Sequence, residues 1–89
     1  MSTQRYSVTF ARAADRQLKK LPADAQRRIV RVVEPLEDEP RPVGAVKLTG
    51  EEHLWRIRVG TYRVVYTIDD QRLLVVVVRV RHRKDAYRG

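Results

Sequence analysis

The alternation of apolar and polar residues in the second half of the chain is the feature that most limits how it can fold. Residues 54–59 alternate, a Gly-Thr pair follows at 60–61, and the alternation resumes from residue 62. This pattern, interrupted by a glycine-containing turn, is typical of an antiparallel hairpin with one buried face. After an Asp-Asp-Gln turn at 69–71, residues 73–81 predict a third strand.

The hairpin is expected to separate apolar residues from arginines, because successive side chains of a strand point to opposite faces. Trp55, Ile57 and Val59 share one face. The other face is predicted to carry a cluster of guanidinium groups, which belong to Arg56, Arg58, Arg63, Arg79 and Arg81. A solvated strand face is the bland interpretation. We favour an anion-binding face, since crowded like charges repel one another without an anionic partner.

The first half of the chain predicts a short strand at residues 6–10 and then two helices. The first helix has an apolar stripe of Ala14, Leu18 and Leu21 and ends at Pro22. The stripe of the second contains Ala25, Ile29, Val32, Val33 and Leu36. A polar connection follows at residues 37–46. The predicted fold is α+β, with an N-terminal helical hairpin packed on a small, mostly antiparallel, four-stranded sheet.

Length and composition restrict the function. A chain of 89 residues is expected to form a single domain, residues 1–89, with one small core. It has no cysteine, two histidines and no long apolar run, so we predict no metal site, no cofactor, no membrane insertion and a cytoplasmic location. The net charge of +8 favours a polyanionic partner, although basic proteins also gain solubility from such charge.

Three segments resemble the RelE family within the wider RelE/ParE toxin superfamily. They are Lys47-Leu48-x-Gly50, the hairpin from Trp55 to Tyr66, and His82-Arg83-Lys84-Asp85-x-Tyr87. Their order and strand spacing extend the resemblance over nearly the whole chain. It implies a toxin that cleaves mRNA in the ribosomal decoding site until a cognate antitoxin neutralises it in a hetero-oligomer.

The resemblance also implies a catalytic set. Arg63 and Arg83 match the family's phosphate-binding arginines, Tyr87 matches its near-terminal tyrosine, and Arg56 and Arg58 stand where well-known members have lysines. The substrate's own 2′-hydroxyl would attack the adjacent phosphorus. Arginine stays protonated and clamps phosphate rather than acting as a base. Tyr87 is therefore the expected base, its phenol activated by nearby guanidinium groups.

Several assignments keep an alternative. Arg81 is a possible addition to the site, and His82 is either a strand-terminal histidine or a proton carrier. The apolar strip Leu73, Val75 and Val77 shares the arginines' parity, so either a bound antitoxin or the chain's own tail is expected to cover it. Another set of cations is either a solvated surface or contacts ribosomal RNA, namely Arg12, Arg16, Lys19, Lys20, Arg27, Arg28, Arg31 and Lys47.

Two other functions fit the same resemblance. One is a ParE-like toxin that inhibits DNA gyrase without nuclease chemistry, and the other is an inactive module that only binds RNA or an antitoxin. The joint presence of Arg56, Arg63, Arg83 and Tyr87 favours the nuclease over the gyrase inhibitor.

Overall fold

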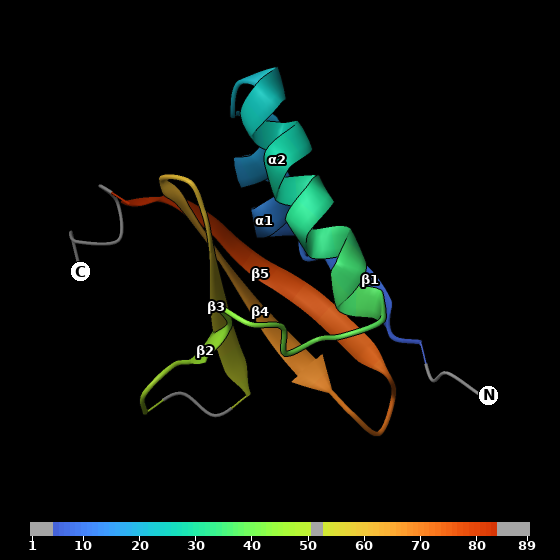
Figure 1. Cartoon of the computed structure of the whole chain (residues 1–89). Helices are drawn as coiled ribbons and strands as arrows, with labels where there is room; N and C mark the ends of the chain where they lie inside the picture. Colours follow the sequence, from blue (N-terminus) through green and yellow to red (C-terminus); the bar gives the residue numbers. More distant parts are fainter. Residues whose placement is uncertain (1–4, 51–52, 84–89) are drawn as a thin grey trace.

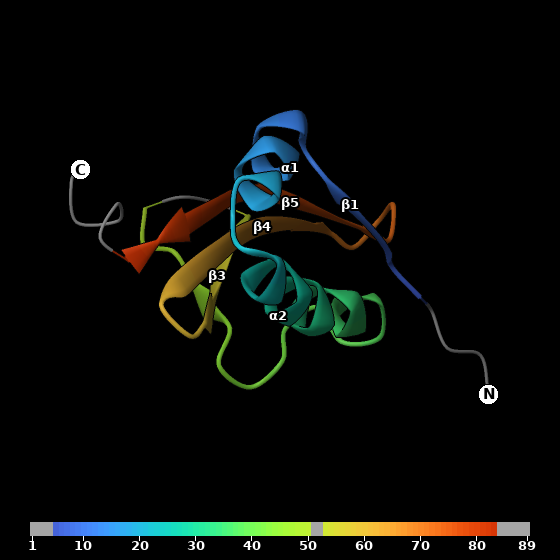
Figure 2. The same cartoon turned by 90° about the horizontal axis from the view of Figure 1, so that it is seen from above.

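The computed structural model describes residues 5–50 and 53–83. In these residues two helices cover one face of a five-stranded sheet (Figures 1 and 2). In chain order the elements are β1 (Ser7–Phe10), α1 (Arg12–Lys19), α2 (Ala23–Val33), the 3-10 helix η1 (Glu34–Glu37), β2 (Val46–Lys47), β3 (Leu54–Val59), β4 (Tyr62–Asp69) and β5 (Leu74–His82). The predicted α+β fold is confirmed.

The sheet has the strand order β1-β5-β4-β3-β2. β1 runs parallel to β5, and the other neighbours are antiparallel. The prediction of four strands was one too few. The additional strand, β2, consists of Val46 and Lys47, which pair with Arg56 and Trp55. Two residues are too few to show a periodic pattern, so the sequence gives no sign of this strand.

The central hairpin of β3 and β4 turns at the predicted Gly-Thr pair. Arg58 lies opposite Arg63, and Val59 lies opposite Tyr62. Gly60, the first of the two turn residues, has a φ of 61°. A residue at this position of a tight hairpin turn needs a positive φ, which glycine adopts without a steric cost. Ile57, Val59 and Val64 of the hairpin are buried in the core, so the arginines that alternate with them lie on the face away from the helices.

The apolar residues of the helices and strands form the core between the two layers. Ala14 and Leu18 of α1 are buried against β5, and Ile29 and Val33 of α2 are buried with Leu36 of η1. These residues belong to the predicted apolar stripes, which are thereby confirmed. None of the helices in the described ranges has the length and apolar character that crossing a membrane requires.

β5 departs from regular alternation through a β-bulge. Val65 of β4 pairs with Arg79, but the next residue, Tyr66, pairs with Val77. Val78 is thus an extra residue in β5. After it, each side chain points to the face opposite to the one that uninterrupted alternation would give it. Val77 faces the helices with Tyr66, whereas Arg79 faces the open side with Val65.

The bulge corrects our expectation for the apolar strip. Val75 and Val77 are 0% exposed and belong to the core, and Leu73 lies in the turn before β5. Val75 and Val77 therefore cannot form a surface for a partner, because the chain's own helical layer covers that face. The alternation predicted for β5 was wrong before Val78 and correct after it, since Val80 is buried and Arg79 is exposed.

A polar cluster joins the α2–β2 connection to the β4–β5 turn, at the end of the sheet opposite Gly60. Arg41 donates two hydrogen bonds to the Asp70 carboxylate, at 2.8 and 3.2 Å, and the Tyr6 hydroxyl donates a third at 2.6 Å. These bonds, led by those from Arg41, lower the pKa of Asp70. The Arg41 guanidinium also lies 5.4 Å from the ring centroid of Trp55. The cluster holds the long connection against the sheet.

Candidate nucleic-acid interface

The open face of the sheet carries two rows of residues that cross β3, β4 and β5. The first row is Arg58, Arg63 and Arg81, which are paired in register from strand to strand. The second row is Arg56, Val65 and Arg79. Neither row contains an acidic residue. Opposed like charges on neighbouring strands destabilise a sheet, so this arrangement is suited to binding an anion across several strands.

Val65 lies between two arginines in the second row. Its side chain is on the open face, yet it is only 9% exposed. Arginine side chains cover apolar neighbours with their methylene stems while the charged ends remain in water. Val65 pairs with Arg56 on one side and Arg79 on the other. The methylene stems of these arginines can therefore pack on Val65 while their guanidinium groups stay in water.

A small hollow adjoins the first row at the β3–β4 turn. Its volume is about 100 Å³, and it is lined by Arg58, Gly60, Thr61, Tyr62, Arg63 and Arg83. The backbone N–H of Arg83 donates a hydrogen bond of 2.7 Å to the carbonyl oxygen of Thr61, which holds the end of β5 beside the turn. This volume is well below that of sites for drug-sized ligands and suits a single small anion such as a phosphate group.

The structure thus brings together three of the five predicted catalytic residues at one hollow, namely Arg58, Arg63 and Arg83. Arg56 lies on the same face in the adjacent row, and Arg81 extends the first row. Tyr87 lies outside the described residues. The sequence analysis did not predict that the Thr61 carbonyl accepts a hydrogen bond from Arg83, because every residue has a backbone carbonyl and the sequence does not show which ones bind.

His82 lies on the other face from the arginine rows. It is paired in register with Tyr62, and the two rings meet edge to face with their centroids 5.3 Å apart. Arg81, its neighbour in β5, faces the open side with Arg63. This geometry directs the imidazole of His82 away from the centre of the arginine rows.

The cations of the two helices form a separate surface on the covered side of the sheet. All seven are exposed: Arg12, Arg16, Lys19, Lys20, Arg27, Arg28 and Arg31. Lys19 makes an ion pair of 3.0 Å with Asp15. Arg28 lies next to Gly60 of the β3–β4 turn, so it connects this surface to the hollow. Lys47 is exposed on β2, at the edge of the sheet.

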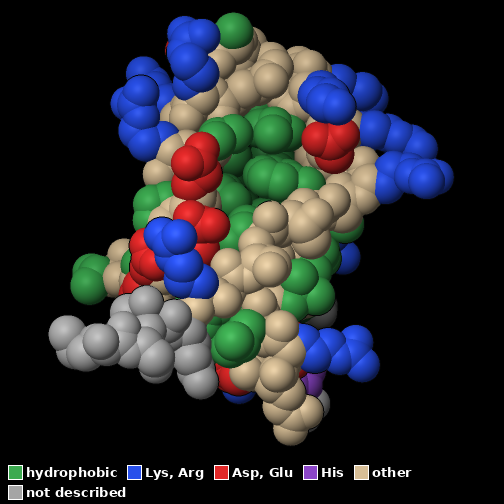
Figure 3. All heavy atoms as spheres, turned by 90° about the vertical axis from the view of Figure 1, so that its right-hand side faces the viewer, with side chains coloured by type: hydrophobic (Ala, Val, Ile, Leu, Met, Phe, Trp, Pro, Cys, Tyr) green, Lys and Arg blue, Asp and Glu red, His purple; other side chains and the backbone are tan. Residues whose placement is uncertain are grey.

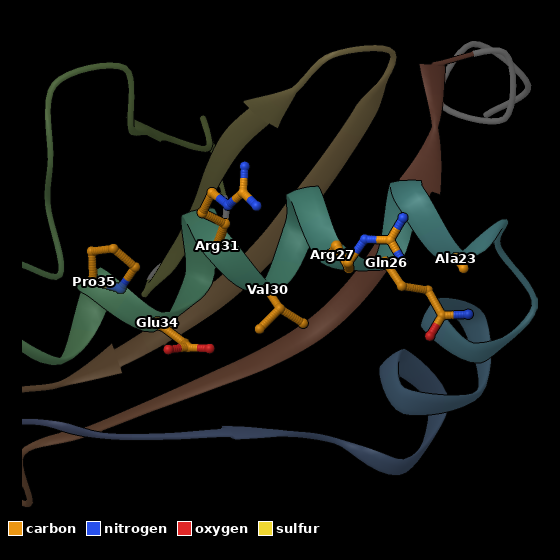
Figure 4. Close-up of a pocket in the computed structure, with 7 residues that line it drawn as sticks. All are labelled: Ala23, Gln26, Arg27, Val30, Arg31, Glu34 and Pro35. Carbon is orange, nitrogen blue, oxygen red and sulfur yellow. The ribbon is translucent and has the colours of Figure 1, made fainter.

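Another groove lies beside α2, away from the arginine rows. Figure 3 shows a hydrophobic floor between charged rims, and Figure 4 shows Gln26 and Val30 of α2 and Glu34 of η1 projecting toward the β1 side. The groove has a volume of about 640 Å³. Because Glu34 lines it together with Arg27 and Arg31, its charge is mixed and less suited to a polyanion. Within the described part of the chain, His, Asp and Glu form no cluster that could hold a metal.

Comparisons with known proteins agree with this fold. The family described as "ParE toxin of type II toxin-antitoxin system, parDE" matches residues 8–87. Toxin RelG of Mycobacterium tuberculosis is 41% identical over 87 residues, which cover 93% of this chain and 97% of RelG. Toxin RelE of the same organism is 34% identical over 84 residues, covering 93% of this chain and 87% of that protein.

Solved toxin–antitoxin complexes contain the same fold. The RelE–RelB complex from Pyrococcus horikoshii includes a chain with a TM-score of 0.79 and 28% identity, covering 89% of this chain and 96% of its own length. A chain of the RelBE2 complex from Mycobacterium tuberculosis has a TM-score of 0.78 and 35% identity, covering 91% and 94%. A basic face on a small sheet under two helices therefore places the molecule in the class of toxin-like α+β proteins. The chain belongs to the RelE/ParE toxins of type II toxin–antitoxin systems.

Proposed function

We propose that this chain is a RelE-type toxin that cleaves mRNA on the ribosome. The observation that carries the proposal is the row Arg58–Arg63–Arg81, three arginines opposed across three strands beside a hollow that Arg83 also lines. Such a row has an electrostatic cost for the free protein and an obvious use in binding phosphate.

The proposed chemistry uses the substrate's own 2′-hydroxyl as the nucleophile, which attacks the adjacent phosphorus and releases the 5′-oxygen. Arg63 and Arg83 hold the phosphate and stabilise the charge that develops on it. Arg56 and Arg58 bind the flanking backbone bidentately, a geometry that guanidinium provides and ammonium does not. Tyr87 takes the proton from the 2′-hydroxyl. This route invokes neither a metal nor a cofactor.

The proposal includes two macromolecular partners. The RelE chains from Pyrococcus horikoshii and Methanococcus jannaschii are bound to RelB antitoxins in their solved complexes, and we expect a cognate antitoxin to neutralise this chain in a hetero-oligomer. The ribosome is the other partner, and the exposed cations of α1, α2 and β2 are candidate contacts to ribosomal RNA. Both partners imply action in the cytoplasm.

A ParE-like inhibitor of DNA gyrase is the second candidate. The observation in its favour is the matched family itself, which is described as a ParE toxin. Gyrase inhibition requires a binding surface but no phosphate-cleaving residues, so the four-arginine set Arg58, Arg63, Arg81 and Arg83 would then have no catalytic use.

One pair of assays separates the candidates. The purified chain is incubated with ribosomes stalled on a defined mRNA, and cleavage sites are mapped; in parallel it is added to a gyrase supercoiling assay. We expect cuts in the decoding site, their loss in the double variant Arg58→Ala/Arg63→Ala, and unchanged supercoiling. Inhibited supercoiling with intact mRNA would identify the ParE-like activity, and no effect in either assay would leave only a binding module.

A further inference from the structure

Part of one strand edge is completed by a side chain instead of a neighbouring strand. β1 pairs with β5 only as far as Phe10 and Val77, and the backbone N–H of Ala11 then donates a hydrogen bond of 2.8 Å to the carbonyl oxygen of Val77. Within the part of the chain that the structure describes, no strand lies beside the rest of β5 on this side. The backbone groups of β5 that point this way beyond Val77 therefore need other partners.

Gln17 of α1 supplies such a partner. The backbone N–H of Val80 donates a hydrogen bond of 2.7 Å to Oε1 of Gln17, across a sequence separation of 63 residues. α1 packs against β5 (Figure 2), and Gln17 lies on the same side of α1 as the buried Ala14 and Leu18. Val80 is only 4% exposed, and a buried donor without an acceptor is unfavourable. The amide of Gln17 thus satisfies an N–H that β1 does not reach.

The place of this hydrogen bond in β5 relates it to the arginine rows. Val78 is the extra residue of the bulge, and a bulge disrupts the strand pairing locally and bends its strand. Val80 follows shortly after, between Arg79 and Arg81 of the open face. Gln17 therefore holds the backbone of β5 just beyond the point where its pairing with β4 is irregular.

A second hydrogen bond holds the other end of the same segment. The backbone N–H of Arg83 donates a bond of 2.7 Å to the carbonyl oxygen of Thr61, beside the hollow. The segment 80–83 is thus held at both ends, and it includes Arg81 of the first row and Arg83 of the hollow. Bidentate contacts from guanidinium to phosphate depend on geometry, and a displacement of about 1 Å can slow a reaction about 100-fold.

We propose that Gln17 is a positioning residue for cleavage. By holding the backbone of Val80, it determines where Arg81 and Arg83 lie relative to Arg63. Gln17 acts through β5 and not on the substrate. The inference rests on the proposed function, because the phosphate bound by these arginines is what makes their spacing important. The alternative role is stabilisation of the fold alone, and the two roles predict different effects of substitution.

Three substitutions separate these roles. Gln17→Met keeps the length of the side chain and removes the oxygen acceptor, whereas Gln17→Glu keeps an acceptor at the same place. Gln26→Met is the matched control, because Nε2 of Gln26 donates a hydrogen bond of 2.8 Å to the carbonyl oxygen of Leu21. Both glutamines bind backbone, but the bond of Gln26 joins α2 to the turn before it and does not involve β5.

Single-turnover cleavage of ribosome-bound mRNA is measured with the full chain over a range of concentrations. Gln17→Met should lower the maximal rate about tenfold and change the half-saturating concentration less than about twofold, because the arginines are displaced while the surfaces that bind the ribosome are intact. Gln17→Glu should recover most of the rate. Gln26→Met should cut at the wild-type rate even where thermal unfolding shows that it is as destabilised as Gln17→Met.

Phosphate binding by the free chain gives a measurement that does not depend on cleavage. Inorganic phosphate is titrated into each variant, and the Nε–Hε NMR signals of Arg63 and Arg83 are followed. Gln17→Met should bind phosphate several-fold more weakly than the wild type, Gln17→Glu should recover the binding, and Gln26→Met should bind normally. If Gln17→Met does not fold, Gln17→Asn replaces it, because its amide is a methylene group too short to reach Val80.

The results distinguish failure of this inference from failure of the proposed function. A wild-type chain that binds phosphate but does not cut mRNA contradicts the proposed function, and the titration still tests the positioning of Arg83. The positioning inference is overturned if the wild type does not bind phosphate, if Gln17→Met binds it normally, if Gln17→Glu fails to recover binding, or if Gln26→Met weakens it equally. In a chain that cuts mRNA, an unchanged maximal rate in Gln17→Met also overturns it.

Discussion

Arg63 and Arg81 lie directly opposite each other on β4 and β5, and both face the open side of the sheet. Arg58 of β3 lies opposite Arg63 on its other flank. Two adjacent strand pairs thus oppose arginine to arginine, although each such pair is unfavourable for folding. The cost is expected to fall when a phosphate binds between the guanidinium groups, so stability and ligand binding are coupled at this row.

The coupling predicts that Arg81→Gln stabilises the free protein. Removing one opposed cation should raise the free energy of unfolding by roughly 0.2–1 kcal/mol. The gain should be largest near 0.01 M salt, where charges interact over about 30 Å, and small at about 1 M salt. Thermal unfolding at both ionic strengths measures it.

Arg72→Gln is the control for this prediction. The Arg72 guanidinium lies 3.9 Å from a carboxylate oxygen of Asp69, an attractive rather than a repulsive neighbour. This substitution should leave stability unchanged or lower it slightly. A loss of stability in Arg81→Gln that matches or exceeds that in Arg72→Gln would contradict a repulsive row.

Cleavage should depend strongly on the residues at the hollow. Arg63→Ala and Arg83→Ala should each slow single-turnover cleavage of ribosome-bound mRNA by about 10²–10³-fold, because each removes a cation that stabilises charge on the phosphorane. Arg72→Ala, in the β4–β5 turn at the far end of the sheet, should cleave normally. Near-normal rates in both hollow variants would mean that the phosphate binds elsewhere.

The sequence was sufficient to predict the hairpin and its arginines. In β3 and β4, alternation runs without interruption on both sides of Gly60, so a parity rule assigns Arg56, Arg58 and Arg63 to the correct face. The apolar stripes of the helices could also be predicted, because each helix buries one side against the sheet. Local periodicity is reliable wherever the backbone is regular.

The sequence was not sufficient for β5. Six consecutive apolar residues, 73–78, include no polar residue whose position would show which alternate side chains are buried. The pairing with β4 determines which residues of β5 are buried, since Tyr66 pairs with Val77 and Val65 pairs with Arg79. The polar cluster of Tyr6, Arg41 and Asp70 could not be predicted from the sequence either, because its members are far apart in the chain and come into contact only in the folded protein.

The bulge makes a specific prediction about deletions in β5. Without Val78, the remaining residues alternate regularly, with Val77 and Val80 inward and Arg79 and Arg81 outward. Deletion of Val78 should therefore preserve the fold, at a cost of about 1–2 kcal/mol. Cleavage should still fall, because bulges add local twist and small displacements of catalytic groups slow reactions markedly.

Deletion of Val80 is the matched control. It removes a core residue and directs Arg81 toward the helices, where an unpaired charge is costly to bury. Thermal unfolding and circular dichroism compare the two deletions. Equal destabilisation by both would contradict the assignment of Val78 as the extra residue.

The Asp70 cluster predicts a pH dependence of stability. Hydrogen bonds from Arg41 and Tyr6 lower the pKa of Asp70 in the folded protein, so the folded state binds this proton less readily than the unfolded state does. The stabilisation is fully present above the unfolded pKa of about 4 and is lost as the pH falls through the lower, folded pKa. Asp70→Asn should be less stable near neutrality and should lose less stability on acidification.

The control for this experiment is Asp24→Asn, which removes an exposed carboxylate at the start of α2. Its acid unfolding should resemble that of the wild type. Denaturant unfolding at a series of pH values gives the comparison. If Asp70→Asn follows the wild type over the whole acid range, the Arg41–Asp70 contact does not contribute to folding.

The identity of the base gives the last prediction. Two groups were considered from the sequence, and the geometry argues against one of them, His82. His82 pairs with Tyr62 on the face away from Arg63 and Arg81, and its ring packs edge to face on the Tyr62 ring. His82→Gln is therefore expected to leave the pH profile of single-turnover cleavage unchanged apart from a modest loss of stability. Tyr87→Phe should lose most of the rate together with the alkaline-rising limb of the profile, since a phenylalanine cannot accept the proton of the 2′-hydroxyl. The opposite result, in which His82→Gln abolishes the limb and Tyr87→Phe retains it, would assign the proton transfer to His82 and would require its ring to turn toward the arginine rows when RNA binds.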